Sequence, residues 1–276
     1  MDTQQAGGQG VLLTSQTARL RSLDDLLEDR APAREIAQMA QRIARRLAVR
    51  RRPREVAAER GAGRVVSVPY RYRSDDIDLD RTIEVLAERP VPDDTDIVVR
   101  ERMRSPRAVV LVVDVSGSMR GEKTRMAAAT VAALSADLGA PGTGDQLALV
   151  AFWSDAALLA PLAKPVPPAR LLDQLMRIPA RGLTNVGFGL SVARAELARS
   201  TARRRTAVLL TDAVHNAGPD PRETARRFDE LHVLCETDGE HDAPLARDMA
   251  RLGHGRYAPI ATHRDVAPAL NRLLVG

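Results

Sequence analysis

The feature that most constrains the fold is the uninterrupted apolar run AVVLVVD at residues 108–114. A strand with one face in water alternates apolar and polar residues, whereas a strand buried on both faces does not. This run therefore predicts a central strand of a mostly parallel sheet that helices cover on both sides. Because aromatic residues make up only 3% of the chain, Val, Leu, Ile and Ala must fill the core.

The chain after residue 106 alternates between strand and helix patterns. Further strands are expected at residues 145–153, 157–162, 205–211, 231–236 and 255–260, and helices at 122–138, 168–178, 185–200, 221–230, 244–252 and 265–274. Ser154 and Asp155 separate two of these strands, as in a hairpin, and so predict an antiparallel pair. We expect residues 106–276 to form one doubly wound α/β domain, mostly parallel, with one antiparallel edge strand.

The residues before this domain have a different composition. Residues 1–16 are rich in Gln, Gly, Ser and Thr, so we expect a poorly ordered tail. Residues 17–105 are expected to form a small, basic and mainly helical region, with an apolar stripe at Ile36, Ala40, Ile43 and Leu47. Within it, short strands are expected at residues 64–70 and 97–103, with a helix between them that ends before Pro90.

Charge and cysteine content limit the classes of function. The net charge of +5 comes mainly from the block Arg42–Arg54, which predicts either a solvated helix face or contact with an anionic partner. The solvated face is favoured, and few aromatic residues are present to stack on bases. A single cysteine, Cys235, excludes an intramolecular disulfide. We see neither a signal peptide nor an apolar span of about 18 residues, and we expect a soluble, cytoplasmic protein.

The central strand ends in a cluster of oxygen-bearing side chains. In the segment DVSGSM, Asp114 ends the strand, and Ser116 and Ser118 follow on alternate residues. Ligands of open α/β sheets bind beyond the carboxyl ends of the strands, so this loop is well placed for a site. Taken alone, the loop is explained equally well as a helix cap and turn.

Two later segments are expected to reach the same edge of the sheet. Thr184, in GLTNVG, precedes a helix, and Asp212, in VLLTDAVHN, follows a strand as Asp114 does. These side chains all offer oxygen, and none offers sulfur or imidazole, which favours Mg²⁺, with Mn²⁺ or Ca²⁺ as alternatives, over zinc or copper. The scattered histidines show no zinc-ligand spacing.

In these three segments the chain resembles the von Willebrand factor A (VWA) family. The match is to the family's metal-ion-dependent adhesion site (MIDAS), which has Asp-x-Ser-x-Ser in a first loop, Thr in a second and Asp in a third. The resemblance implies that Asp114, Ser116 and Ser118 ligate a metal, with Thr184 direct or through water and Asp212 mainly through water. Members often carry Gly after the third-loop Asp, where this chain has Ala213.

The resemblance also implies a function. Two carboxylates and three hydroxyls leave a coordination position of Mg²⁺ open, which an Asp or Glu of another protein can fill. We expect the residues that border this position to contact that partner; they are Gly117, Met119, Asn185, His215 and Asn216. With its basic leader and the lead-in DIVVRERMRSPR, the chain is similar to CoxE-type proteins and the D subunit of magnesium chelatase, which implies a MoxR-type AAA+ ATPase partner in metal insertion or protein maturation.

An enzyme is not expected. A phosphatase of the haloacid dehalogenase type needs a second acid two residues after Asp114, where Ser116 stands. A P-loop fails because Glu122 precedes Lys123, and the Gly-x-Gly-x-x-Gly pattern is missing after Asp114. The alternative function is that of an RNA-associated protein, in which the segment Arg42–Arg54 contacts phosphates.

Overall fold

The structure is a computed structural model that describes residues 11–13, 21–22, 38, 64–70, 76–88, 93, 96–103, 106–116, 121–138, 144–163, 166–178 and 182–274. Backbone contacts divide the chain into two units, which are described separately. The smaller unit lies within Arg51–Ser105, and the larger unit comprises the remaining residues.

The smaller unit consists of a hairpin and a helix. Strands β3 (Arg64–Pro69) and β4 (Val98–Met103) pair in antiparallel register, and helix α2 (Leu79–Glu88) lies between them in the sequence. Thr82 is buried and ties the helix to β4, because its hydroxyl donates to Val98 O and accepts from Val98 N. The expected strands and helix are therefore confirmed, but the description of residues 17–105 as mainly helical omits this hairpin.

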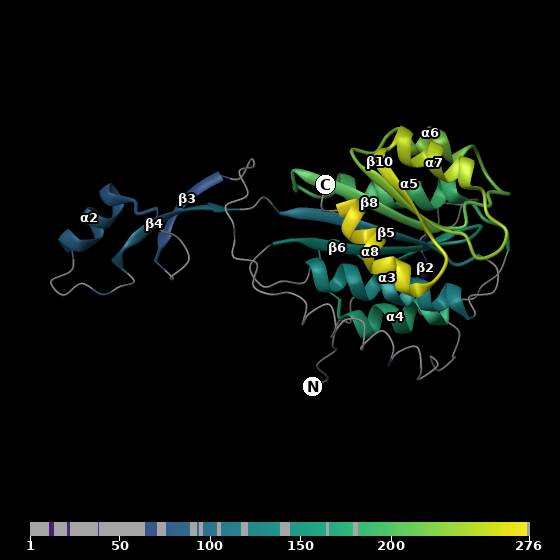
Figure 1. The fold of residues 1–276 in the computed structure, drawn as a ribbon, viewed down its shortest axis with the longest axis horizontal. Helices are drawn as coiled ribbons and strands as arrows, with labels where there is room; N and C mark the ends of the chain where they lie inside the picture. Colours follow the sequence, from purple (N-terminus) through teal and green to yellow (C-terminus); the bar gives the residue numbers. More distant parts are fainter. Residues whose placement is uncertain are drawn as a thin grey trace. The chain divides into compact units, whose positions relative to one another are not determined.

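The larger unit is built on an eight-stranded sheet in the order β10-β9-β8-β5-β6-β7-β1-β2. Strands β5 (Arg107–Asp114), β6 (Gln146–Phe152), β8 (Arg204–Thr211), β9 (Leu231–Glu236) and β10 (His254–Ile260) pair in parallel. Strand β7 (Ala156–Ala160) is antiparallel to β6, as the hairpin at Ser154 and Asp155 predicts. The mostly parallel α/β fold predicted from the sequence is thus confirmed (Figure 1).

The antiparallel edge is broader than expected. Strand β1 (Val11–Leu13) pairs with β7, and β2 (Arg21–Ser22) pairs with β1, both antiparallel. Strand β7 is therefore not the edge, and residues 11–13 of the expected poorly ordered tail belong to the sheet. The physical reason is that β7 offers a row of unpaired backbone groups, which a short apolar segment can satisfy.

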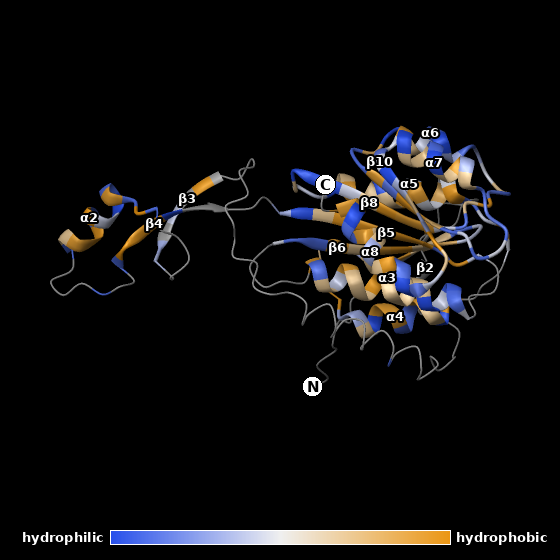
Figure 2. Cartoon of the chain, viewed as in Figure 1, coloured by the Kyte–Doolittle hydropathy of each residue, from blue (hydrophilic) through white to orange (hydrophobic). Residues whose placement is uncertain are grey.

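Helices cover both faces of the sheet. On one face α3 (Glu122–Leu138), α4 (Pro168–Arg177) and α8 (His263–Leu274) share a hydrophobic core with alternate residues of β5, beginning with Val109. On the other face α5 (Val186–Ala198), α6 (Pro221–Ala225) and α7 (Ala243–Leu252) share a second core with the residues of β5 between them. All eight residues of β5 are buried, and the strands are the hydrophobic layer of Figure 2.

Close packing of α5 against the sheet depends on a glycine. A Cβ added at Gly189 would lie 2.6 Å from the ring of Phe152 in β6, which is below any normal contact distance. This packing fixes the start of α5, and with it Thr184 and Asn185, beside the carboxyl end of β6. Among the described residues, no helix is both long and apolar enough to span a membrane.

Candidate metal and partner site

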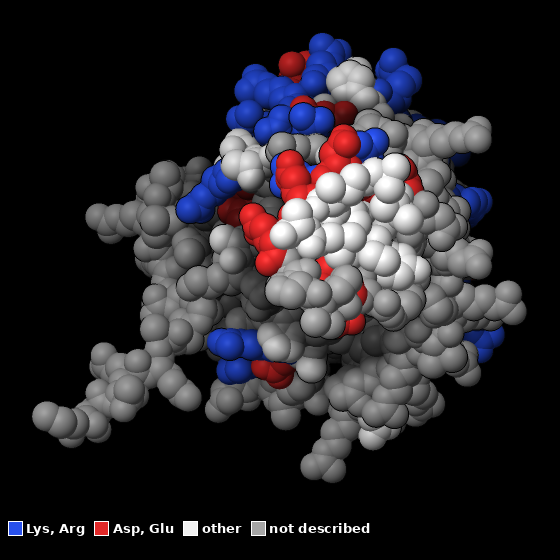
Figure 3. Space-filling model, turned by 90° about the vertical axis from the view of Figure 1, so that its left-hand side faces the viewer, with Lys and Arg blue, Asp and Glu red and all other residues white. Residues whose placement is uncertain are grey.

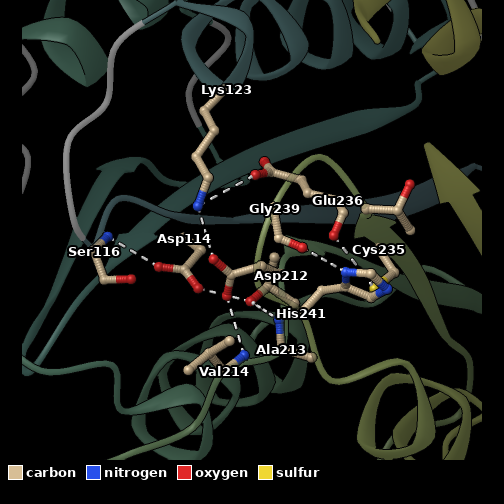
Figure 4. Close-up of polar contacts among 12 residues, drawn as sticks. Asp114, Ser116, Lys123, Asp212, Ala213, Val214, Cys235, Glu236, Gly239 and His241 are labelled. Atoms are coloured by element: carbon tan, nitrogen blue, oxygen red, sulfur yellow. Dashed lines mark hydrogen bonds and ion pairs between the residues drawn. The ribbon is translucent and has the colours of Figure 1, made fainter. Parts of the chain in front are cut away.

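The site forms where the strands of the larger unit end. Asp114 is the last residue of β5, Asp212 follows the last residue of β8, and Glu236 is the last residue of β9. Because β5, β8 and β9 are adjacent parallel strands, their carboxyl ends meet at one edge and bring these three carboxylates together (Figure 4).

Asp114 is held by the first and third loops. Its Oδ1 accepts a hydrogen bond of 2.9 Å from Ser116 N, and its Oδ2 accepts one of 2.6 Å from Thr211 Oγ1. Asp114 is buried. This burial, reinforced by the charge of Asp212, raises the pKa of Asp114 to about 6 despite those two hydrogen bonds. A buried carboxylate beside another carboxylate is stabilised in its ionised form by a nearby cation.

The third loop is shaped by an alanine in a left-handed conformation. Ala213 has a φ of 62°, a region that glycine adopts freely and other residues seldom adopt. Its N–H donates to Thr211 Oγ1 at 2.9 Å, and Val214 N donates to Asp212 Oδ1 at 3.0 Å. The loop therefore keeps, with alanine, a backbone shape that suits the glycine often found there in the VWA family.

The second and third loops are joined by hydrogen bonds. Thr184 N donates to Asn216 Oδ1 at 2.7 Å, and Asn216 N and Ala217 N both donate to Thr184 O at 3.2 Å. A Cβ added at Gly218, whose φ is 82°, would collide with the amide of Asn185. Since Asp114 contacts Thr211 as well, the three loops predicted to converge do meet, and the third loop connects the other two.

Several residues expected at the site have other contacts. Asn185 is buried, and its Oδ1 caps α5 by accepting from Phe188 N at 3.0 Å, while Asn216 orients Thr184. His215 is partly buried in the third loop. Contact of these three residues with a partner remains a prediction. The remaining expected residues lie outside the described residues; they are Gly117, Ser118 and Met119.

Two charged residues at the site were not predicted. Lys123 Nζ lies 2.7 Å from Asp212 Oδ2 and 3.9 Å from Glu236 Oε2. Burial acts to lower the pKa of Lys123, but its contacts with Asp212, Glu236 and Asp114 raise it. Burial also raises the pKa of Glu236 to about 8, since the opposing effect of Lys123 is smaller and Asp114 and Asp212 add to the rise. The available signal was the carboxylate that ends the apolar run LHVLCE.

The part of the chain that holds this site matches a known protein family. Residues 109–215 match the family model described as the von Willebrand factor type A domain, a span that contains all three loops. Among curated proteins, uncharacterized protein Rv2850c of Mycobacterium tuberculosis is 39% identical over 143 residues, which cover 50% of this chain and 22% of that protein. The chain thus spans about a fifth of the length of this relative.

One solved structure supports the fold of the larger unit, and a second is similar to part of the chain. A von Willebrand factor type A protein from Catenulispora acidiphila has a TM-score of 0.50 and 20% identity, covering 63% of this chain and 43% of that one. Proximal thread matrix protein 1 from the mussel byssus, described with a zinc-occupied MIDAS motif, has a TM-score of 0.49 and 17% identity, covering 61% and 47%. At these identities the likeness concerns the fold alone.

Proposed function

With residues 109–215 assigned to a von Willebrand factor type A domain, we propose that this domain is a non-enzymatic, metal-dependent protein-binding module. A divalent cation, Mg²⁺ in the first place, would be held by Asp114, Ser116, Thr184 and Asp212, together with Ser118 outside the described residues. The observation that carries this proposal is that the third loop contacts both the buried Asp114, through Thr211, and the second loop, through Asn216 and Thr184.

The chemistry of the side chains fits such an ion. The candidate ligands are two carboxylates and neutral hydroxyls, which hard cations with oxygen preference select. The buried carboxyl of Asp114 would lose its unfavourable charge environment when a cation lies beside it. When bound, the ion supplies a Lewis-acidic position that accepts a carboxylate oxygen from outside. We propose that this carboxylate is an Asp or Glu of another protein.

One apolar side chain supports docking at this edge. Among the described residues of the larger unit, Leu183 is the large apolar residue that stands out as exposed, with 54% of its surface accessible. It precedes Thr184, a candidate ligand, and follows Gly182, whose φ of 86° turns the backbone there. An apolar side chain beside an ionic contact would help to exclude water from that contact when a partner docks.

The finer proposal is that the partner is a separately encoded AAA+ ATPase of the MoxR type, acting with this protein in the cytoplasm in metal insertion or protein maturation. It rests on the similarity of the chain to CoxE-type and chelatase D proteins in its basic leader. The alternative of RNA binding depends on Arg42–Arg54, which lies outside the described residues.

The proposal is tested by affinity capture with MgCl₂ and with EDTA, using the full chain, the D114A variant and the L183S variant. We expect an AAA+ ATPase to be captured only with Mg²⁺ and not by D114A. L183S should capture less partner while binding the metal as the unmodified protein does. Capture of the same proteins with and without EDTA would contradict docking through the metal. RNA binding that falls steeply with salt and ignores EDTA would favour the alternative.

A further inference from the structure

The site contains a cation of its own. Lys123 comes from the first turn of α3 and reaches the carboxylates at the ends of β8 and β9 (Figure 4). Its Nζ donates to Asp212 Oδ2 at 2.7 Å, while about a third of its side chain remains accessible, 32%. Asp212 is also a candidate ligand of the metal, so Lys123 and a divalent ion compete for the same carboxylate.

Glu236 offers Lys123 a second partner in the same place. Its Oε2 lies 3.9 Å from Lys123 Nζ, just inside ion-pair range and beyond hydrogen-bond range, and its side chain is only 6% exposed. A buried carboxylate that stays ionised ordinarily has a close hydrogen-bonded cation. The structure instead places the lysine on Asp212, with Glu236 within the reach of a small side-chain rotation.

We propose that Lys123 is a resident counter-ion that moves from Asp212 to Glu236 when a divalent ion binds. The inference rests on the proposed metal site and assigns roles to two residues that do not ligate the ion. In the metal-free protein Lys123 neutralises Asp212 and so weakens the attraction of the site for a cation. Glu236 is a positioning residue, because it accepts the ammonium group once Asp212 turns to the ion.

The charges of the cluster agree with this arrangement. Fully ionised, Asp114, Asp212 and Glu236 carry three negative charges and Lys123 one positive charge, which leaves two negative charges. One divalent ion balances this charge, provided that Lys123 is retained. With Glu236 as its partner after metal binding, the lysine stays paired in both states.

The experiment is isothermal titration of MnCl₂ into the full chain and its variants at pH 8 in the same buffer. K123M should bind Mn²⁺ about tenfold more tightly, since a positive charge near the ion is removed. E236Q should bind about tenfold more weakly, because Lys123 then stays on Asp212. In the K123M background E236Q should change the affinity by less than about twofold.

Two control variants separate this role from a general effect of charge or folding. Arg125 lies on the same turn of α3, but its side chain is 50% exposed and pairs with Glu122. R125M should leave Mn²⁺ affinity within about twofold of the unmodified value, because solvent screens an exposed charge. K123R should keep the weak affinity of the unmodified protein. Thermal melts in EDTA show whether each variant is folded.

The outcomes distinguish the two proposals. Failure of the unmodified chain to bind Mn²⁺ would overturn the proposed function and this inference with it. Binding that is equal in the unmodified chain and K123M would overturn the counter-ion role alone. If E236Q weakens binding as much without Lys123 as with it, Glu236 acts directly on the ion. A structure with Mn²⁺ should show Lys123 Nζ closer to Glu236 than to Asp212; the reverse would contradict the transfer.

Discussion

Carboxylates near the beginning of the central strands are closely paired with a cation, whereas those at the end of the strands are only partly paired. Where β5 and β6 begin, Arg107 binds Asp145 through its backbone N–H at 2.8 Å and through Nη2 at 2.7 Å, and it also reaches Asp137 at 3.0 Å. Where β5, β8 and β9 end, one lysine contacts two of three clustered carboxylates. Figure 3 draws one side of the molecule, on which both basic and acidic side chains reach the surface.

The pKa values of two glutamates at the ends of β9 show the same contrast between the beginning and the end of the sheet. Glu230, which precedes β9, has its pKa lowered to about 2, first by His232 and then by Thr206 and Arg204. Glu236, which ends the same strand, has its pKa raised to about 8 by burial. The beginning of the sheet therefore satisfies its charges internally, whereas its end keeps excess negative charge. We infer that the beginning of the sheet serves stability and that its end serves binding.

The largest effect on stability should come from removing a carboxylate at the satisfied end. D145N leaves the buried guanidinium of Arg107 without its main partner, and we expect unfolding to become about 3 kcal/mol easier. Urea denaturation at pH 7 in EDTA measures this change. D229N is the matched control, because Asp229 pairs with Arg205 at 2.7 Å but its side chain is 55% exposed. Its effect should stay below about 1 kcal/mol, and equal effects of both variants would remove the contrast.

The same substitution at the other end should have the opposite sign. Because the pKa of Asp114 is raised in the folded protein, ionisation of this carboxyl disfavours folding. D114N removes the carboxyl, so the metal-free variant should melt at the same temperature as the unmodified protein or higher. At the same time its affinity for Mn²⁺ should fall by at least about 100-fold, since a ligand is lost. Differential scanning fluorimetry with and without MnCl₂ measures both. A lower melting temperature in EDTA would show that Asp114 serves stability.

The metal-free protein should lose stability as the pH rises. Because the folded-state pKa of Glu236 is about 8, above its usual 4.5, its contribution is fully present below pH 4.5 and is lost as the pH rises through about 8. Ionisation of Asp114, whose pKa is about 6, adds a further loss of stability as the pH rises to about 6. Urea denaturation in EDTA at pH 5, 6, 7 and 8 should show the decline, and E236Q should reduce it. A slope unchanged in E236Q would mean that Glu236 is not the titrating group.

The smallest effect should come from the third loop. Replacing Ala213, at a φ of 62°, by glycine relieves a left-handed conformation but gives the unfolded chain more freedom. These contributions nearly cancel, so A213G should change the free energy of unfolding by less than about 1 kcal/mol. A213V should destabilise the protein clearly, because a β-branched residue fits this region poorly. Similar stability of the two variants would contradict the observed loop shape.

Much of the fold and of the candidate site could be predicted from sequence, but neither the electrostatics of the site nor its contrast with the beginning of the sheet. Asp114, Ser116, Thr184 and Asp212 were expected from their positions at strand and helix boundaries, which local patterns reveal. Glu236 could not be assigned to the site from sequence, because this requires knowing that β9 lies beside β8, and local sequence patterns do not reveal the order of strands in a sheet. In the sequence, Lys123 fits only part of a P-loop pattern, whose spacing fails. Strand β1 was missed because a three-residue strand depends on the free edge of β7.

The account depends most on one measurement, the titration of MgCl₂ or MnCl₂ into the unmodified chain, D114N and D145N by calorimetry. We predict one ion bound per chain for the unmodified protein, the same affinity for D145N within about twofold, and no measurable binding for D114N. If D114N and the unmodified protein released the same heat, the end of the sheet would not be a metal site.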